Sequence, residues 1–170
     1  VEIGTGNGYH FAHYAQANPE RCFLGLEIKY KPLIQSIRRA RANGSENMRI
    51  LRYNASFLNN LFEPGEVDNL IIHHPDPWPK KRKWKRRLIQ DEFLDMTHEL
   101  QRPGSVVDFK TDDLPYFEWA LERFQRSKYS QVDHTFDLHH SKFMPENFVT
   151  HFEQIFLKKN QPIYFLRAFH

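Results

Sequence analysis

Short apolar runs alternate with amphipathic segments along the whole chain. Apolar runs of about four to eight residues are typical of strands, whereas apolar residues spaced about three or four apart indicate helices. This rule predicts strands over residues 1–4, 22–28, 48–53, 67–74, 105–110, 129–138 and 161–168. It predicts helices over residues 8–17, 31–42, 88–100, 114–126 and 146–158.

The alternation of strand and helix indicates the α/β class, with a mostly parallel sheet covered by helices on both faces. Asn43-Gly44 marks the end of the second helix, and Glu63-Pro64-Gly65 and Arg102-Pro103-Gly104 mark turns. No repeat, low-complexity tract or linker interrupts the pattern, so we expect one domain over residues 1–170. The chain opens on the end of a strand without an initiator Met, so we also expect that an N-terminal segment is missing.

The composition suits a single domain with a sizeable core: 170 residues, 40% of them hydrophobic, including 15 phenylalanines. No apolar run approaches the ~20 residues that cross a bilayer, and no signal-peptide pattern is present, so we expect no membrane partner and a cytoplasmic location. The single cysteine, Cys22, lies in an apolar stretch, and we expect a small buried side chain in a reducing compartment. The sequence leaves monomer and homodimer undetermined.

Positive charge is concentrated in one segment. Seven of the eight residues from Lys80 to Arg87 are basic, and the rest of the chain has 17 basic and 21 acidic residues, a net charge of −4. A charge run is commonly a solvated face, but this one directly follows the loop Pro75-Asp76-Pro77-Trp78-Pro79. We therefore interpret the run as a phosphate-binding surface.

Three alternating prolines make this loop stiff. Each proline fixes its own φ angle and disfavours the helical region for the residue before it, so we expect Asp76 and Trp78 on extended backbone. A rigidly held carboxylate and indole beside a polyanion-binding surface indicate a site for chemistry on a nucleic-acid base.

A second motif lies at the first predicted strand-to-helix junction, where Gly4, Gly6 and Gly8 would let the backbone approach a ligand closely. Glu27 ends the next strand, where a carboxylate accepts from ribose hydroxyls. The spacing does not match the G-x-G-x-x-G of dinucleotide sites, and Glu2 precedes the glycines, which favours S-adenosylmethionine. Asn54 would either contact the adenine or serve as a turn residue in Asn-Ala-Ser.

Five strings occur in order along nearly the whole chain: Glu-Ile-Gly-x-Gly-x-Gly, Pro-Asp-Pro-Trp-Pro-Lys-Lys-Arg, Lys-Arg-Arg-Leu, Phe-Lys-Thr-Asp and Thr-x-x-Glu. The set resembles the tRNA (guanine-N7)-methyltransferases. That resemblance implies a Rossmann-like S-adenosylmethionine-dependent methyltransferase fold, a seven-stranded sheet with an antiparallel last strand. It also implies tRNA as partner and methylation of a guanine in its variable loop.

The resemblance also implies residue roles. Asp76 would be the catalytic residue, and the S-adenosylmethionine site would comprise Glu2, Gly4, Gly6, Gly8, Glu27, Asn54 and Asp76. The guanine or nearby substrate would be held by Lys80, Asp112, Thr150 and Glu153, with residues 150–153 acting as one stretch. RNA would be contacted by Arg82, Lys83, Trp84, Lys85, Arg86 and Arg87. The chain departs from the family pattern at Asn7, Asn54, His74 and Lys83.

Guanine N7 carries an exposed lone pair, so methyl transfer requires orientation more than proton removal. We expect Asp76 to orient the base and stabilise the positive charge that develops on it, with Asp112 and Glu153 helping. Carboxylates would also accept from guanine N1–H and the exocyclic amine, which selects guanine over adenine.

Structural alternatives remain for several of these residues. Asp112 or Asp113 could cap the helix that Pro115 enters, and Thr150 and Glu153 have capping-box spacing but fall inside the predicted helix 146–158. Trp84 could stack on a base, although we favour packing. The adjacent histidine pairs 73–74 and 139–140 are poor chelates, so we expect no metal site.

Two other functions stay open: a methyltransferase acting on another RNA or on a non-RNA substrate, and an inactive RNA-binding module that keeps the fold.

Overall fold

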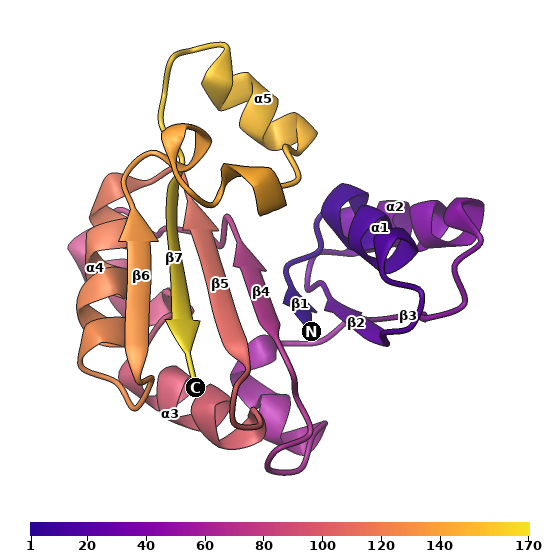
Figure 1. Cartoon of the computed structure of the whole chain (residues 1–170), viewed down its shortest axis with the longest axis horizontal. Helices are drawn as coiled ribbons and strands as arrows, with labels where there is room; N and C mark the ends of the chain where they lie inside the picture. The colour runs from indigo at the N-terminus through magenta and orange to yellow at the C-terminus, as the bar shows by residue number, and fades with distance from the viewer.

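The seven strands form one mixed sheet in the order β3-β2-β1-β4-β5-β7-β6 (Figure 1). The computed structural model describes the backbone of residues 1–170 and every side chain except that of His151. Neighbouring strands are parallel from β3 to β5, and β7 runs antiparallel to both β5 and β6. The strands are β1 (Glu2–Ile3), β2 (Phe23–Leu26), β3 (Met48–Leu51), β4 (Leu70–His73), β5 (Val106–Thr111), β6 (Gln131–Thr135) and β7 (Tyr164–Phe169).

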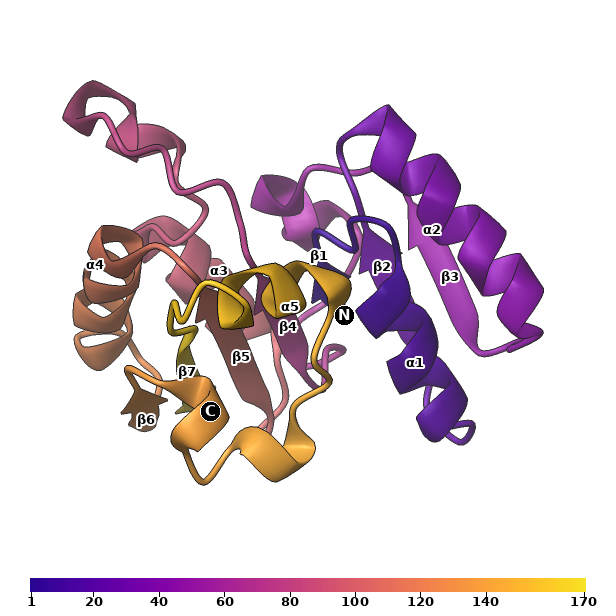
Figure 2. The same cartoon turned by 90° about the horizontal axis from the view of Figure 1, so that it is seen from above.

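Helices cover both faces of this sheet, and α5 lies above the upper ends of β5 and β7 (Figures 1 and 2). Helices α1 and α2 pack on each other and on β2 and β3, whereas α4 packs on β5, β6 and β7. The α-helices are α1 (Tyr9–Ala17), α2 (Tyr30–Asn43), α3 (Asp91–Leu100), α4 (Leu114–Gln125) and α5 (His151–Leu157). Short 3-10 helices are η1 (Ala55–Asn60), η2 (Lys81–Arg86), η3 (Leu138–His140) and η4 (Met144–Glu146). The predicted α/β class, seven strands and antiparallel last strand are confirmed.

The main core lies where β4 and β5 meet α3 and α4. Leu70 and Ile72 of β4 and Phe109 of β5 are fully buried there, with Phe117 and Phe124 of α4 packed against the same cluster. A central strand of a parallel sheet is buried on both faces, which explains why β4 reads as a continuous apolar run. None of the described helices is long and apolar enough to span a membrane.

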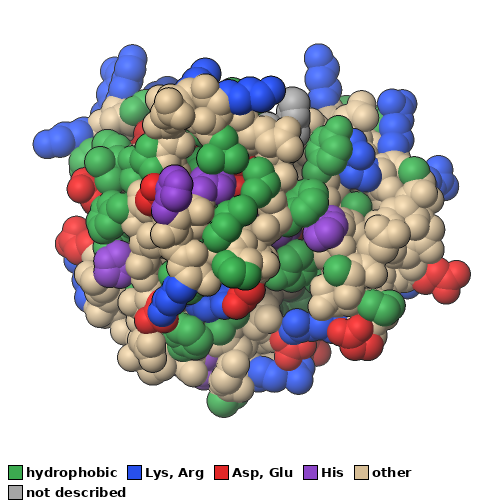
Figure 3. Space-filling model, turned by 45° about the horizontal axis from the view of Figure 1, so that its top comes forward, with side chains coloured by type: hydrophobic (Ala, Val, Ile, Leu, Met, Phe, Trp, Pro, Cys, Tyr) green, Lys and Arg blue, Asp and Glu red, His purple; other side chains and the backbone are tan. Residues whose placement is uncertain are grey.

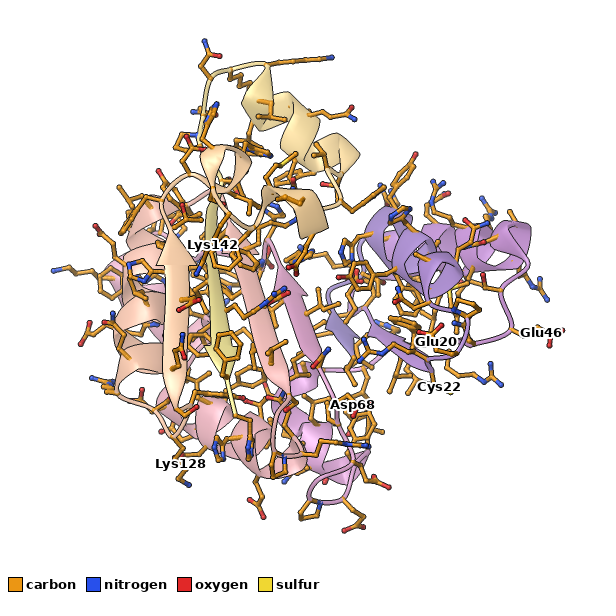
Figure 4. The ribbon with its side chains drawn as sticks, viewed as in Figure 1. Glu20, Cys22, Glu46, Asp68, Lys128 and Lys142 are labelled. Carbon is orange, nitrogen blue, oxygen red and sulfur yellow. The ribbon has the colours of Figure 1, made fainter. Side chains whose placement is uncertain are left out.

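Several predicted elements begin later than expected, and two of these differences change an expectation about named residues. The predicted helix 146–158 is instead η4 followed by extended backbone, and α5 begins only at His151, because Pro145 favours a short turn and Thr150 provides a new N-terminal cap. Strand β2 begins at Phe23, so Cys22 lies before it and is exposed. The expectation that Cys22 is buried is therefore wrong, and Figure 4 shows it near Glu20 at the lower edge of the right-hand part of the molecule.

Candidate cofactor and RNA-binding site

The topology brings the candidate residues to one end of the sheet. The chain runs from β1 outward to β2 and β3, then returns to place β4 on the other side of β1. In open α/β sheets, ligands bind at such a switch point, beyond the carboxyl ends of the strands. The glycine loop follows β1, Glu27 follows β2, and the Asp76 loop follows β4.

The glycine loop is held open by Glu27. Gly4, Gly6 and Gly8 have φ angles of 78°, 53° and 78°, a region that favours glycine. One carboxylate oxygen of Glu27 accepts from Gly6 N at 3.0 Å, and the other accepts from Lys29 N at 2.7 Å. A Cβ added at Gly4 would have no heavy atom within 4 Å, so the loop presents free space to a ligand. Gly8 is needed for close packing as well, since a Cβ there would lie 2.6 Å from the Ser36 hydroxyl of α2.

A cavity of about 390 Å³ opens above this loop. Glu2, Gly4 and Gly6 form part of its wall, with His74 and Phe152 among the residues on the other parts. Glu2 is buried, and its carboxylate is 2.7 Å from Nδ1 of His10. This acidic, glycine-walled cavity suits a ligand that combines a positively charged amino-acid end with a sugar.

A second cavity, of about 600 Å³, brings Asn54 and Asp76 together with Trp78 and Arg86. Asn54 caps η1, since its side-chain oxygen accepts from Ser56 N at 3.1 Å. It therefore has the turn role considered from the sequence while also lining this cavity. Asp76 is 3.1 Å from Nζ of Lys29, and both side chains are more than half exposed, so the Asp76 carboxylate is accessible to a ligand.

The proline loop is stiff but not fully extended. Trp78 has a φ angle of 45° and His74 one of 49°, so extended backbone at Trp78 was a wrong expectation. The prolines exclude the right-handed helical region but leave left-handed turns open, and these let the chain change direction twice within a few residues. Non-glycine residues in such conformations cost of order 1–3 kcal/mol each and cluster at functional sites.

The basic segment forms η2 and projects beyond the sheet between β4 and α3 (Figure 2). Lysines and arginines stand out along the upper rim of the molecule, above a face of hydrophobic and histidine side chains (Figure 3). Lys83 and Arg86 lie over the Trp78 ring, with Nζ and Cζ 5.3 Å and 5.2 Å from its centroid. The exposed members of the segment are Lys80, Lys81, Arg82, Lys85 and Arg86, and Lys83 is half-buried.

Two members of this segment point inward. The Trp84 ring packs edge-on against Trp119 with centroids 5.0 Å apart, as the packing alternative expects. Arg87 is only 2% exposed, and its Nε donates to the Pro77 carbonyl at 2.8 Å. The structure contradicts an RNA contact for Arg87, because its charged group is enclosed by aromatic rings.

The adjacent carboxylates 112 and 113 have separate partners. Asp113 caps α4 by accepting from Tyr116 N at 2.8 Å. Asp112 instead lies 3.0 Å from Nδ1 of His74, whose ring lines the first cavity. The capping alternative therefore applies to Asp113, whereas Asp112 contacts the His74 ring that lines the first cavity.

The two ends of the stretch 150–153 also have different surroundings. Thr150 lines the first cavity and caps α5 by accepting from Glu153 N at 3.2 Å. Glu153 is fully buried, and its carboxylate pairs with Nζ of Lys110 and accepts from Asn147 Nδ2 at 3.0 Å. The structure contradicts direct guanine contact by Glu153, since its oxygens face the interior.

Sequence reasoning missed four partners of the acidic residues: His10 beside Glu2, Lys29 beside Asp76, His74 beside Asp112, and Lys110 beside Glu153. The signal for Lys110 was present, since a lysine that follows Val107 and Phe109 in a central strand requires a buried counter-charge. His10 and Lys29 carried no comparable signal, because both lie in ordinary helix and loop contexts.

Comparison with known proteins shows to which family the chain belongs. A family model described as "Putative methyltransferase" matches residues 1–166. The tRNA (guanine-N(7)-)-methyltransferase of Bdellovibrio bacteriovorus is 48% identical over 167 residues, covering 98% of this chain and 80% of that protein. The chain belongs to the tRNA (guanine-N7)-methyltransferase family. The tRNA (guanine-N(7)-)-methyltransferase of Lachnoclostridium phytofermentans is 36% identical over 169 residues, covering 99% of this chain and 79% of that protein.

The fold of this family member also matches more distant enzymes. A precorrin-6y C5,15-methyltransferase from Geobacter metallireducens superposes with a TM-score of 0.70 at 14% identity, covering 99% of this chain and 76% of the other. That likeness concerns the fold alone, and it agrees with the Rossmann-like methyltransferase architecture expected from the sequence.

Proposed function

We propose that this protein transfers the methyl group of S-adenosylmethionine to N7 of a guanine in tRNA. The observation that carries the proposal is one juxtaposition in a member of this family. The open glycine loop, the accessible Asp76 carboxylate and the basic segment all meet at the carboxyl end of the same sheet. Residues 1–170 would act as a single methyltransferase domain.

The chain fits S-adenosylmethionine at both cavities. Glu2 would meet the charged amino-acid end, and Gly4 and Gly6 leave the space it needs. Glu27, already fixed by two backbone amides, would accept from ribose hydroxyls, and Asn54 would lie near the adenine. When bound, the cofactor supplies a methyl group on a positively charged sulfonium.

The residues around the base would act electrostatically during methyl transfer. N7 of guanine uses its lone pair to form the new N–CH₃ bond while the bond from methyl carbon to sulfur breaks and its electron pair returns to sulfur. The base thereby becomes a cation, and Asp76 orients it and stabilises this charge. No proton has to leave N7, so Asp76 need not act as a base.

The remaining polar residues select and orient the substrate. Asp112 would accept from the N–H groups of guanine, and Thr150 and Lys80 would contact the base or its nucleotide. Glu153 contributes indirectly, by holding α5 and with it Thr150 against the sheet through Lys110. The exposed cations of η2 and Lys80 would bind phosphates next to the target guanine in the variable loop.

The test supplies purified protein with methyl-labelled S-adenosylmethionine and, separately, bulk tRNA, ribosomal RNA and total protein. The proposal predicts label in tRNA, and it is contradicted by label confined to another acceptor. Absence of transfer together with retained tRNA binding would instead support an inactive RNA-binding module.

A further inference from the structure

Arg87 differs from its neighbours in the basic segment. Lys85 and Arg86 are exposed, whereas Arg87 is fully enclosed and has turned toward the protein interior. Its Nε donates to the carbonyl oxygen of Pro77, and among the described residues its Nη1 and Nη2 have no hydrogen-bond partner. The bond to Pro77 is therefore the one directional contact of this guanidinium in the described structure.

Three aromatic rings surround the guanidinium. Its Cζ lies 4.5 Å from the centroid of Trp84, 4.9 Å from Tyr116 and 5.1 Å from Trp119. Cations over aromatic faces are stabilised by the ring quadrupole, more strongly when desolvated. A planar guanidinium stacks in such a site, whereas an ammonium does not reproduce its shape or its Nε donor.

The same rings fix the chain on either side of Arg87 to helix α4. Trp119 donates from Nε1 to the Ile89 carbonyl at 3.0 Å, and Ile89 N donates to the Tyr116 hydroxyl at 3.2 Å. Gln90 donates from its amide to the carbonyls of Trp84 and Arg87 at 2.8 Å and 3.1 Å. The end of the basic segment is thus anchored to the body of the fold.

We infer that Arg87 is a positioning residue that links this anchored end to the loop bearing Asp76. Pro77 directly follows Asp76, so a bond to its carbonyl fixes the peptide next to the carboxylate. The cations at the start of the segment would bind RNA phosphates, while Arg87 holds the reacting loop at a set place relative to them. This inference rests on the proposed function for its catalytic consequence.

The decisive variant is Arg87→Lys, which keeps the charge and removes both the planar stack and the Nε donor. Losing a charged hydrogen bond of this kind predicts a fall in kcat of about 10- to 100-fold at saturating tRNA. The affinity for tRNA and its salt dependence should stay within about twofold of wild type. Arg102→Lys is the matched comparison, since Arg102 is an exposed arginine paired with Asp68 outside both cavities, and it should retain wild-type kcat and a wild-type Asp76 loop.

A phosphate contact at Arg87 predicts the opposite pattern. Arg87→Met would then weaken tRNA binding and make the slope of log affinity against log salt shallower by about one, as expected for Arg86→Met. Wild-type kcat in Arg87→Lys, or this shallower slope in Arg87→Met with kcat retained, would overturn the inference.

Two further measurements keep the inference testable if Arg87→Lys folds poorly or the protein does not methylate tRNA. Trp119→Phe loosens the stack from α4, outside the basic segment, and should lower kcat without changing tRNA affinity. Backbone ¹⁵N relaxation at Asp76 and Trp78 needs no activity, and Arg87→Lys should lower the order parameters of both amides from about 0.85 toward about 0.6. Unchanged order parameters in both variants would contradict the positioning role, whatever the substrate is.

Discussion

Nδ1 of His74 lies 3.0 Å from a carboxylate oxygen of Asp112 at the wall of the glycine-loop cavity. An ionised carboxylate only accepts, so the proton of the neutral ring lies on Nδ1. Burial lowers the pKa of His74, more than the bond to Asp112 raises it, so the ring is neutral near pH 7. Nε2 is then an acceptor, and among the described residues it has no partner.

Replacing Asp112 should therefore affect the substrate and spare the cofactor. Asp112→Ala removes a carboxylate that we propose contacts the guanine and frees the His74 ring, so we expect kcat/KM for tRNA to fall about 10- to 100-fold. The Kd for S-adenosylmethionine should stay within about twofold in calorimetry. Asp137→Ala is the matched control because it breaks the exposed pair of Asp137 with His140, 2.8 Å apart. Equal kcat/KM values for the two variants would contradict a substrate role for Asp112.

The buried pair of Lys110 and Glu153 should be stabilising only as a pair. Removing one partner leaves an uncompensated buried charge, so we expect Glu153→Leu to lower the free energy of unfolding by about 3–5 kcal/mol. Lys110→Met combined with Glu153→Leu should recover much of that loss in urea unfolding. Asp95→Ala, which breaks the exposed pair with Lys128 (labelled in Figure 4), should change stability little. A double variant as unstable as the sum of the two single variants would contradict this coupling.

His73 should make the fold sensitive to mild acid. Burial lowers the pKa of His73 well below 6.5, and the positive charge of Lys110 lowers it further, with His10 and His74 adding to this. Below pH about 6.5 the His73 ring is protonated in the unfolded chain but stays neutral in the folded protein. The free energy of unfolding therefore falls as the pH falls. Above that pH the ring is neutral in both states and contributes no pH dependence.

Thermal unfolding at pH 7.5 and 5.5 tests this sign. The wild type should melt at a lower temperature at pH 5.5, and His73→Phe should reduce the difference between the two. His134→Phe, at an exposed position of β6, should leave the difference as in wild type. An equal pH difference in His73→Phe and wild type would exclude His73 as a source.

Salt dependence tests the basic segment as a phosphate-binding surface. If about five of its exposed cations contact phosphates, log affinity for tRNA should fall with log salt at a slope of roughly −4 to −5. Arg82→Ala should make the slope shallower by about one. Lys128→Ala, at the lower end of the molecule in Figure 4, should leave it unchanged. A slope near zero in the wild type would rule out phosphate binding by this segment.

The sequence predicted the sheet well, because strands and glycine turns have local signatures. The candidate site residues that follow β1, β2 and β4 lie at one end of that sheet, and their roles stay predictions. The sequence predicted poorly which side chains the charged residues contact. Arg87 lies among seven basic residues, and only the placement of Trp84, Tyr116 and Trp119 in space turns its side chain inward. Glu153 was likewise assigned to the substrate, since its pairing with Lys110 joins positions 43 residues apart.

The proposed reaction methylates one atom, N7 of a guanine, in tRNA. Wild-type protein should be incubated with S-adenosylmethionine and tRNA, and 7-methylguanine mapped by borohydride reduction and aniline cleavage, with Asp76→Asn in parallel. We expect cleavage of the wild-type product at a single variable-loop guanine. In Asp76→Asn, cleavage should fall about 100-fold while tRNA affinity stays near that of wild type. Methylated tRNA without aniline-sensitive cleavage, or full cleavage in Asp76→Asn, would contradict this proposal.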